Sequence, residues 1–132
     1  MQVVIIDDHQ MFTDAVALTL QHKLADCQVI GFSKASELAH YFAQNNRADL
    51  LIVDVNLASH CGLDLVRQYR DSPLVEAIIV CSGETNYMLP EQCQSLGADG
   101  FWGKSGSVED FLLMVQQVLA SGRKGYLQPR DG

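Results

Sequence analysis

Short apolar runs alternate along the chain with longer segments in which apolar residues recur at helical spacing. Most of these runs contain Val or Ile without polar alternation, which is typical of parallel strands buried on both faces. The runs are Gln2–Ile6, Gln28–Phe32, Leu50–Val53, Ala77–Cys81 and Gly100–Gly103. Strands that alternate with helices favour a parallel sheet covered by helices on both faces.

Two helices are predicted between the first three runs. A stripe of apolar residues predicts the inward face of the first helix, formed by Phe12, Val16, Leu20 and Leu24 with Ala15 and Leu18 beside them. The second can be capped by Ser33 or Ser36, and its inward face contains Leu38, Tyr41 and Phe42. It should end near Asn45 and Asn46, because asparagine tolerates left-handed backbone geometry.

Three further helices complete the pattern. The third follows Gly62 and stops before Pro73, with Leu63, Leu65, Val66 and Tyr69 facing inward. A short fourth helix covers Pro90–Leu96, with the proline at its first position. The fifth begins at a near-match to a capping box, Ser107 and Asp110, and ends at Gly122, and its stripe contains Phe111, Leu112, Val115, Val118 and Leu119.

The length and composition of the chain fit one globular domain. A chain of 132 residues can enclose a core without disulfides, and 48% apolar with 19% charged residues excludes disorder as the main state. We expect a doubly wound α/β domain over residues 1–122, with a five-stranded parallel sheet in the flavodoxin-like order 2-1-3-4-5. Residues 123–132 are expected to form a tail or the start of a linker to an absent output domain.

The charge of the chain argues against direct binding to nucleic acid or membrane. Sixteen acidic against nine basic residues leave a net charge of −7, which repels phosphates and anionic lipids. Because no apolar stretch reaches the length of a membrane span and no basic leader is present, we expect a cytoplasmic location. The cysteines lack zinc-site or disulfide spacing; they are Cys27, Cys61, Cys81 and Cys93.

Reactive side chains follow the predicted strands at the edge where open parallel sheets bind ligands. They are Asp7 and Asp8 after the first run, Asp54 after the third, Ser82 and Gly83 after the fourth, and Lys104 after the fifth. Right-handed crossovers in the order 2-1-3-4-5 would bring these strand ends together.

Three carboxylates in one cleft repel one another, so we expect a divalent cation among them. Oxygen ligands favour Mg²⁺, whose octahedral shell also accepts phosphate oxygens. Lys104 adds a positive charge for the same phosphate, and Ser82 adds a hydroxyl donor. The set fits phosphoryl transfer, and Asp54 at the centre of the sheet is the best candidate for the nucleophile.

Several segments together resemble the receiver domain of bacterial two-component response regulators. They are Val4–Asp8, Leu51–Asp54 followed by Gly62, Val80–Gly83 and Gly97–Lys104. The start of the first predicted helix, from Asp8 to Phe12, also resembles receivers of LuxR-type transcription factors. We interpret His9 in this segment as the start of the helix rather than as a base.

The resemblance implies a role for each residue of the cluster. Asp54 would accept phosphate from a sensor histidine kinase or a phosphotransfer protein. Mg²⁺ would be held by Asp8, Asp54 and the backbone carbonyl of Asn56, with Asp7 acting chiefly through water.

The resemblance also implies a switch. Ser82 and Lys104 would contact the phosphoryl oxygens, and Phe101 would be the aromatic residue that turns inward when Ser82 moves toward the phosphate. The face formed by the fourth helix, the fifth strand and the fifth helix would report the state.

The expected function is phosphorylation-switched signalling that regulates an output, namely transcription. The domain would catalyse only its own phosphorylation and slow dephosphorylation, and would not be a metabolic enzyme. Apolar and small residues on the fifth helix make a homodimer on phosphorylation a further expectation, and DNA would be reached only through an absent output domain. Two alternatives are a phosphorylation-independent interaction module and a Mg²⁺-dependent phosphohydrolase with an aspartyl-phosphate intermediate. The second lacks a further carboxylate beside the nucleophile at Val55 and Asn56.

Overall fold

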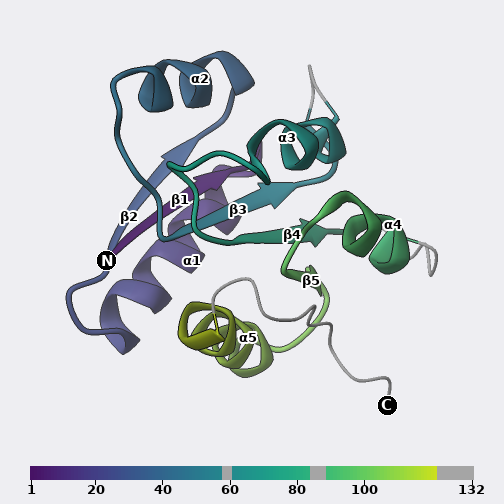
Figure 1. Cartoon of the computed structure of the whole chain (residues 1–132). Coiled ribbons are helices and arrows are strands. Elements are labelled where there is room, and N and C mark those ends of the chain that lie inside the picture. The colour runs from purple at the N-terminus through teal and green to yellow at the C-terminus, as the bar shows by residue number, and fades with distance from the viewer. Residues whose placement is uncertain (58–60, 84–88, 122–132) are drawn as a thin grey trace.

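A computed structural model describes residues 1–57, 61–83 and 89–121 of the chain (Figure 1). The strands are β1 Gln2–Ile6, β2 Gln28–Phe32, β3 Leu50–Asp54, β4 Ile78–Ser82 and β5 Gly100–Gly103. The helices are α1 Gln10–Lys23, α2 Ala35–Ala43, α3 Gly62–Tyr69, α4 Leu89–Leu96 and α5 Val108–Ser121. The predicted end of the fifth helix at Gly122 and the predicted tail at 123–132 lie outside the described residues.

All five strands pair in parallel in the order β2-β1-β3-β4-β5, which confirms the predicted topology. The helices cover both faces of this sheet, with α1 and α5 on one face and α2, α3 and α4 on the other (Figure 1). Each face has its own apolar core, because alternate residues of the central strands point to opposite sides. In β1, for example, Val4 packs with α2 and α3, whereas Ile5 packs with α1 and α5.

Two of the central strands end one residue later than the hydrophobic pattern predicts. β3 includes Asp54, which pairs with Cys81 of β4, and β4 runs from Ile78 to Ser82 rather than from Ala77 to Cys81. Backbone pairing continues because it does not depend on the polarity of the side chain. Asp54 and Ser82 are therefore fixed by the sheet itself and do not lie in the following loops.

The edge strand β2 is not buried on both faces, contrary to the expectation for all five runs. Its residues are half-buried or exposed, whereas every residue of β3 and β4 is buried. β2 pairs only with β1, so its outer side has no neighbouring strand in the sheet. The continuous apolar pattern distinguishes strand from helix here, but it does not predict burial at an edge.

The inward stripe of α1 is narrower than predicted. Val16 and Leu20 are buried, but Ala15 is exposed and Leu18 is 73% exposed. The buried face instead includes Thr13. The methyl carbon of Thr13 lies only 2.5 Å from the point where a Cβ on Gly31 would stand. This close approach of α1 to β2 leaves the side that carries Ala15 and Leu18 in solvent.

Helix starts differ from prediction in α2 and α4. The N-cap of α2 is Lys34 rather than Ser33 or Ser36, and Glu37 accepts the backbone N–H of Lys34 at 3.1 Å. α4 begins at Leu89, so Pro90 is its second residue. Two other predictions are confirmed: Asn45, just after α2, has the left-handed φ of 63°, and at the start of α5 Ser107 Oγ accepts the backbone N–H of Asp110 at 3.1 Å.

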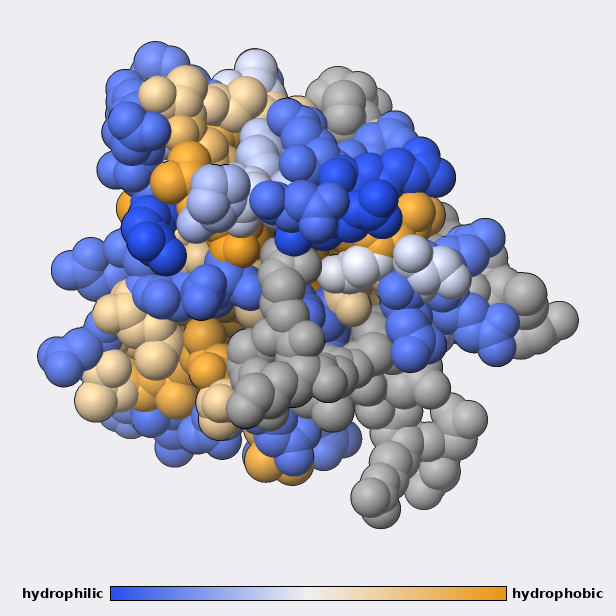
Figure 2. All heavy atoms as spheres, in the orientation of Figure 1, coloured by the Kyte–Doolittle hydropathy of each residue, from blue (hydrophilic) through white to orange (hydrophobic). Residues whose placement is uncertain are grey.

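On the face of the molecule shown in Figure 2, polar side chains lie mostly at the periphery, with apolar side chains visible between them. The large apolar side chains that remain exposed on helices are Met11 and Leu18 of α1, and Val108 and Leu113 of α5. Within the described part of the chain, every helix is too short or too polar to cross a membrane.

Candidate functional site

The carboxyl ends of β1, β3 and β5 bring two buried acids and a lysine together. Asp7 directly follows β1, and its backbone N–H donates to the carbonyl of Phe32 at 3.0 Å. Asp54 ends β3, next to β1 in the sheet. Lys104 directly follows β5, and its N–H donates to the carbonyl of Ser82 at 2.8 Å. The sheet thus places residues from distant parts of the chain in one cluster, as the sequence predicts.

Lys104 is the cation of this cluster. Its Nζ lies 2.8 Å from Asp7 Oδ2 and 3.5 Å from Asp54 Oδ2, and the side chain is 16% exposed. Both carboxylate side chains are only 1% exposed. One ammonium therefore neutralises part of the charge of two buried carboxylates, and one negative charge is left in excess.

The pKa of Asp54 is raised by burial and by this excess negative charge. Burial raises the pKa of this carboxyl above its ordinary value, and the charge of Asp7 raises it further. The backbone N–H of Asn56, which donates to Asp54 Oδ1 at 3.2 Å, lowers the pKa, as do Lys104 and His9. Asp54 Oδ2 is buried and accepts no hydrogen bond from the described residues.

The donor set fits a divalent cation. Asp7 and Asp54 present buried carboxylate oxygens, and His9 presents a ring nitrogen within 4.8 Å of an oxygen of each. An orphaned buried carboxylate oxygen is stabilised by a nearby cation, and oxygen-rich sites suit Mg²⁺. Asp8 is exposed at the rim of this cluster, and Asn56 is also exposed.

Two further predicted residues lie on the neighbouring strands β4 and β5. Ser82, the last residue of β4, is fully buried, and its carbonyl oxygen holds the backbone of Lys104. Phe101 of β5 is 7% exposed and belongs to the core that contacts α2, α3 and α4. The ring of Phe101 is thus directed inward in this structure.

Sequence reasoning missed the position of His9. Its backbone N–H donates to Asp7 Oδ1 at 2.7 Å, and its Nδ1 lies 3.1 Å from the same oxygen. It also missed Phe12, whose ring centroid lies 4.5 Å from Lys104 Nζ. Both residues could have been found from their closeness in sequence to Asp7, because the turn after a strand and the first turn of the next helix lie over the end of that strand.

Gly62 allows α3 to start against the backbone of Asp54. A Cβ at this position would overlap the carbonyl oxygen of Asp54 and would lie 2.8 Å from the Cα of Val55. The N–H of Gly62 donates to the carbonyl of Val55 at 3.0 Å. The first turn of α3 therefore rests directly on the strand end that carries Asp54.

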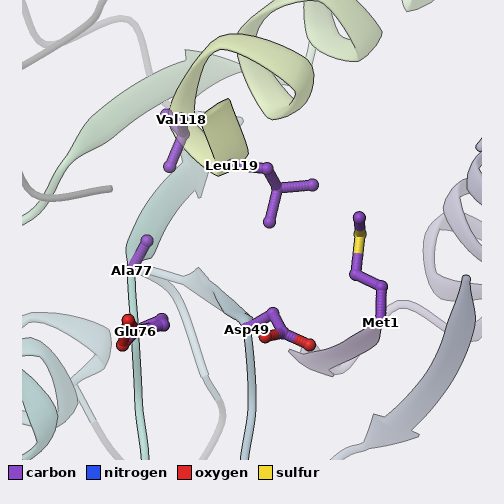
Figure 3. Close-up of a pocket in the computed structure, with 6 residues that line it drawn as sticks. All are labelled: Met1, Asp49, Glu76, Ala77, Val118 and Leu119. Atoms are coloured by element: carbon purple, nitrogen blue, oxygen red, sulfur yellow. The ribbon is translucent and has the colours of Figure 1, made fainter. Parts of the chain in front are cut away.

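A cavity of about 320 Å³ lies away from this cluster, near the opposite, amino-terminal ends of the strands (Figure 3). It is lined by Met1, Asp49, Glu76, Ala77, Val118 and Leu119. Asp49 is engaged in the fold, because its Oδ2 accepts the backbone N–H of Gln2 at 2.7 Å. The reactive side chains named by the sequence are all at the other end of the strands.

The arrangement agrees with one known family. A family model described as the response regulator receiver domain matches residues 3–116. The chain belongs to the response regulator receiver family. Its five-stranded parallel sheet with helices on both faces is thus the fold of a receiver domain.

Curated relatives of this receiver domain are response regulators. The response regulator GacA of Pseudomonas aeruginosa is 27% identical, and the match covers 98% of this chain and 59% of GacA. The virulence transcriptional regulatory protein PhoP of Shigella flexneri is 25% identical, with 90% of this chain and 52% of PhoP covered. The chain spans little more than half the length of these relatives.

Solved structures support the same assignment. A LuxR family DNA-binding response regulator from Silicibacter pomeroyi is 27% identical, with a TM-score of 0.82 and 98% of both chains covered. A response regulator protein from Burkholderia pseudomallei, with a phosphorylated aspartic acid, a calcium ion and citrate, is 25% identical and has a TM-score of 0.74. The match covers 90% of this receiver chain and 68% of that protein.

Proposed function

We propose that this receiver domain accepts a phosphoryl group on Asp54 from a sensor histidine kinase or a phosphotransfer protein. The observation that carries the proposal is the Asp54 carboxylate, which is buried at a strand end, has an oxygen without a hydrogen bond and lies 3.5 Å from the Lys104 ammonium. An oxygen nucleophile beside a fixed positive charge is the arrangement that phosphoryl transfer requires.

In the proposed reaction, a carboxylate oxygen of Asp54 attacks phosphorus and forms an acyl phosphate. The bond from phosphorus to the donor nitrogen breaks, and the departing imidazole takes up a proton. Ser82 and Lys104 are positioned to bind phosphoryl oxygens, because they end β4 and follow β5 beside Asp54. The domain catalyses this step and the later hydrolysis only on itself.

A divalent cation, Mg²⁺ in the simplest case, neutralises charge on the transferring phosphoryl group when it is bound. We assign it to Asp8, Asp54 and the backbone carbonyl of Asn56, with Asp7 acting chiefly through water. Support comes from the Burkholderia pseudomallei protein, whose structure contains both a phosphorylated aspartic acid and a calcium ion.

Phosphorylation would change the surface that the domain presents to its output. Three new acceptor oxygens would draw Ser82 and Lys104 toward Asp54. The sequence predicts that Phe101 turns inward at this step; because its ring is already buried here, phosphorylation would hold it in that position. The face of α4, β5 and α5 would then favour a different partner, including a second copy of this chain through α5. We infer transcription as the regulated output, which agrees with the transcriptional regulators among the relatives.

The test is the intact mass of the purified chain after incubation with acetyl phosphate, with and without Mg²⁺. Wild type is expected to gain one phosphoryl group in a Mg²⁺-dependent reaction, and Asp54→Asn is expected to gain none. Asp14→Asn, which changes an exposed acid of α1, is the matched control and should be labelled like wild type. Light scattering on the same samples measures whether the labelled form is a dimer.

Labelling of Asp54→Asn at the wild-type level would contradict the assignment of the nucleophile. Absence of labelling in wild type, under conditions where the divalent cation binds, would favour an interaction module that works without phosphorylation.

A further inference from the structure

The imidazole of His9 lies in the acid cluster instead of capping the helix that it precedes. His9 is the N-cap of α1, yet its side chain makes no capping hydrogen bond. Its Nδ1 lies 3.1 Å from Asp7 Oδ1 and 3.7 Å from Asp54 Oδ2. The ring therefore faces the two buried carboxylates, and its side chain has no part in starting the helix.

The Lys104 ammonium marks the position of a cation among these three groups. Its Nζ is 2.8 Å from Asp7 Oδ2, 3.5 Å from Asp54 Oδ2 and 3.1 Å from His9 Nδ1. An ammonium group only donates protons, so the ring nitrogen is the acceptor in the last contact. Three acceptors from two strand ends thus converge on one positive charge. Asp7 Oδ2 is held by the ammonium, whereas Asp54 Oδ2 accepts no hydrogen bond within the described residues.

Two of the acceptors, His9 Nδ1 and Asp7 Oδ1, lie as close together as neighbouring ligands of one metal ion. Adjacent ligands of an octahedral ion stand about 3 Å apart when the bonds to the metal are about 2.1 Å long. His9 Nδ1 and Asp7 Oδ1 are 3.1 Å apart, and one ligand atom from each of the three residues lies within 4.8 Å of the others. Because the His9 side chain is 65% exposed, water and phosphoryl oxygens can reach the remaining positions.

We propose that His9 is a metal ligand through Nδ1 and gives this site a preference for a first-row transition ion such as Mn²⁺ over Mg²⁺. Mg²⁺ favours oxygen ligands, whereas an imidazole nitrogen strengthens the binding of transition ions. The inference rests on the proposed function, because the same ion would neutralise the phosphoryl group on Asp54; it differs from that assignment in that Asp7 would bind the ion directly, beside His9, and not through water. With an ion bound to the acids, Lys104 would no longer be needed to balance their charge and would be free to bind phosphate.

The test uses Mn²⁺ alone as the probe of the full chain. Electron paramagnetic resonance gives the affinity for Mn²⁺, competition with Mg²⁺ gives the ratio of the two affinities, and pulsed measurements detect a nitrogen bound to the ion. His9→Gln is compared with His22→Gln, which changes an exposed histidine of α1. Wild type and His22→Gln are expected to show directly bound nitrogen, and His9→Gln is expected to lose it. The ratio of Mn²⁺ to Mg²⁺ affinity should fall about tenfold in His9→Gln only.

Two results would overturn the inference. One is bound Mn²⁺ without nitrogen coupling in wild type, and the other is nitrogen coupling that persists in His9→Gln. Failure of this inference is distinguishable from failure of the proposed function, since phosphoryl acceptance on Asp54 is measured separately by mass with Mg²⁺. A wild-type chain that binds neither ion would contradict both.

Discussion

Gly62 controls how closely α3 approaches the strand that carries the phosphoacceptor. A methyl group there would overlap backbone atoms of Asp54, which cannot move aside without shifting the site. Gly62→Ala is therefore expected to lower the free energy of unfolding by about 2 kcal/mol and to slow labelling by acetyl phosphate. Urea unfolding and the rate of mass gain measure the two effects.

Gly103→Ala is the matched control for this change, because a Cβ at Gly103 would meet no atom within 4 Å. Equal losses in the two variants would show that the effect comes from the flexibility of glycine in general and not from the contact with Asp54.

Burial of Asp54 makes the stability of the metal-free domain depend on pH. Its pKa is raised above the ordinary value of 3.8, chiefly by burial, so the folded state retains a proton that the unfolded state has released. Stability therefore falls as pH rises from the unfolded pKa through the folded pKa. Asp54→Asn removes this cost, and with a chelator present it should unfold at a higher urea concentration than wild type at pH 7.

The difference between Asp54→Asn and wild type should shrink as the pH is lowered through the ordinary pKa of 3.8, below which Asp54 is protonated in both states. A difference that stays constant across this range would show that the gain comes from packing or hydrogen bonding of the amide.

The position of a single side chain can be predicted from the sequence when the backbone alone determines it. Asp54 and Lys104 follow from the sequence because strand ends of a parallel sheet share one edge, whatever the side chains do. The directions of His9 and Phe12 do not follow, since they depend on the turn after β1 and on the position of Lys104. Leu18 is exposed for a related reason: spacing identifies the helix, but the contact of Thr13 with β2 sets its rotation.

At the level of elements, a column of aromatic rings connects the site with α5. Lys104 Nζ lies 4.5 Å from the ring centroid of Phe12, and Phe12 stacks on Trp102 of β5 with 6.1 Å between centroids. Trp102 in turn lies 4.8 Å from Phe111 in the first turn of α5. The column runs from α1 through β5 to α5, and the ammonium contacts the ring at its α1 end.

Trp102 is the single tryptophan of the chain, so its fluorescence reports on this column. In the proposed mechanism Lys104 moves toward the phosphoryl group, and the emission of Trp102 is therefore expected to change in wild type when acetyl phosphate and Mg²⁺ are added. Phe12→Leu should reduce that change by at least half while leaving the mass gain intact. Asp54→Asn serves as the control without a response.

An equal change of emission in Phe12→Leu and wild type would show that Trp102 senses phosphorylation by another route, such as the backbone of β5.

Among elements, the order of strands and helices follows from the sequence, whereas some ends do not. Hydrophobic patterning stops at Val53 and Cys81, but pairing continues through Asp54 and Ser82 because the backbone groups still bond across the sheet. The sequence marks where a strand becomes polar, and the neighbouring strand decides where it ends.

At the scale of the whole molecule, the two faces of the sheet have separate cores, and the reactive side chains all lie at one edge. This division is predictable, because right-handed crossovers in a parallel sheet permit few arrangements. The position of a bound cation cannot be predicted in this way, because it depends on the distances between a few side chains at the ends of β1, β3 and β5.

The order in which the ribosome makes this chain also bears on its site. β1 lies between β2 and β3, and His9 and Lys104, which touch in the finished fold, are 95 positions apart. When Asp54 has just left the ribosome, the nascent chain therefore contains the acids but neither Lys104 nor β5. Truncated products would thus present a carboxylate without its ammonium, and a kinase would meet a competent acceptor only after nearly the whole domain has been synthesised.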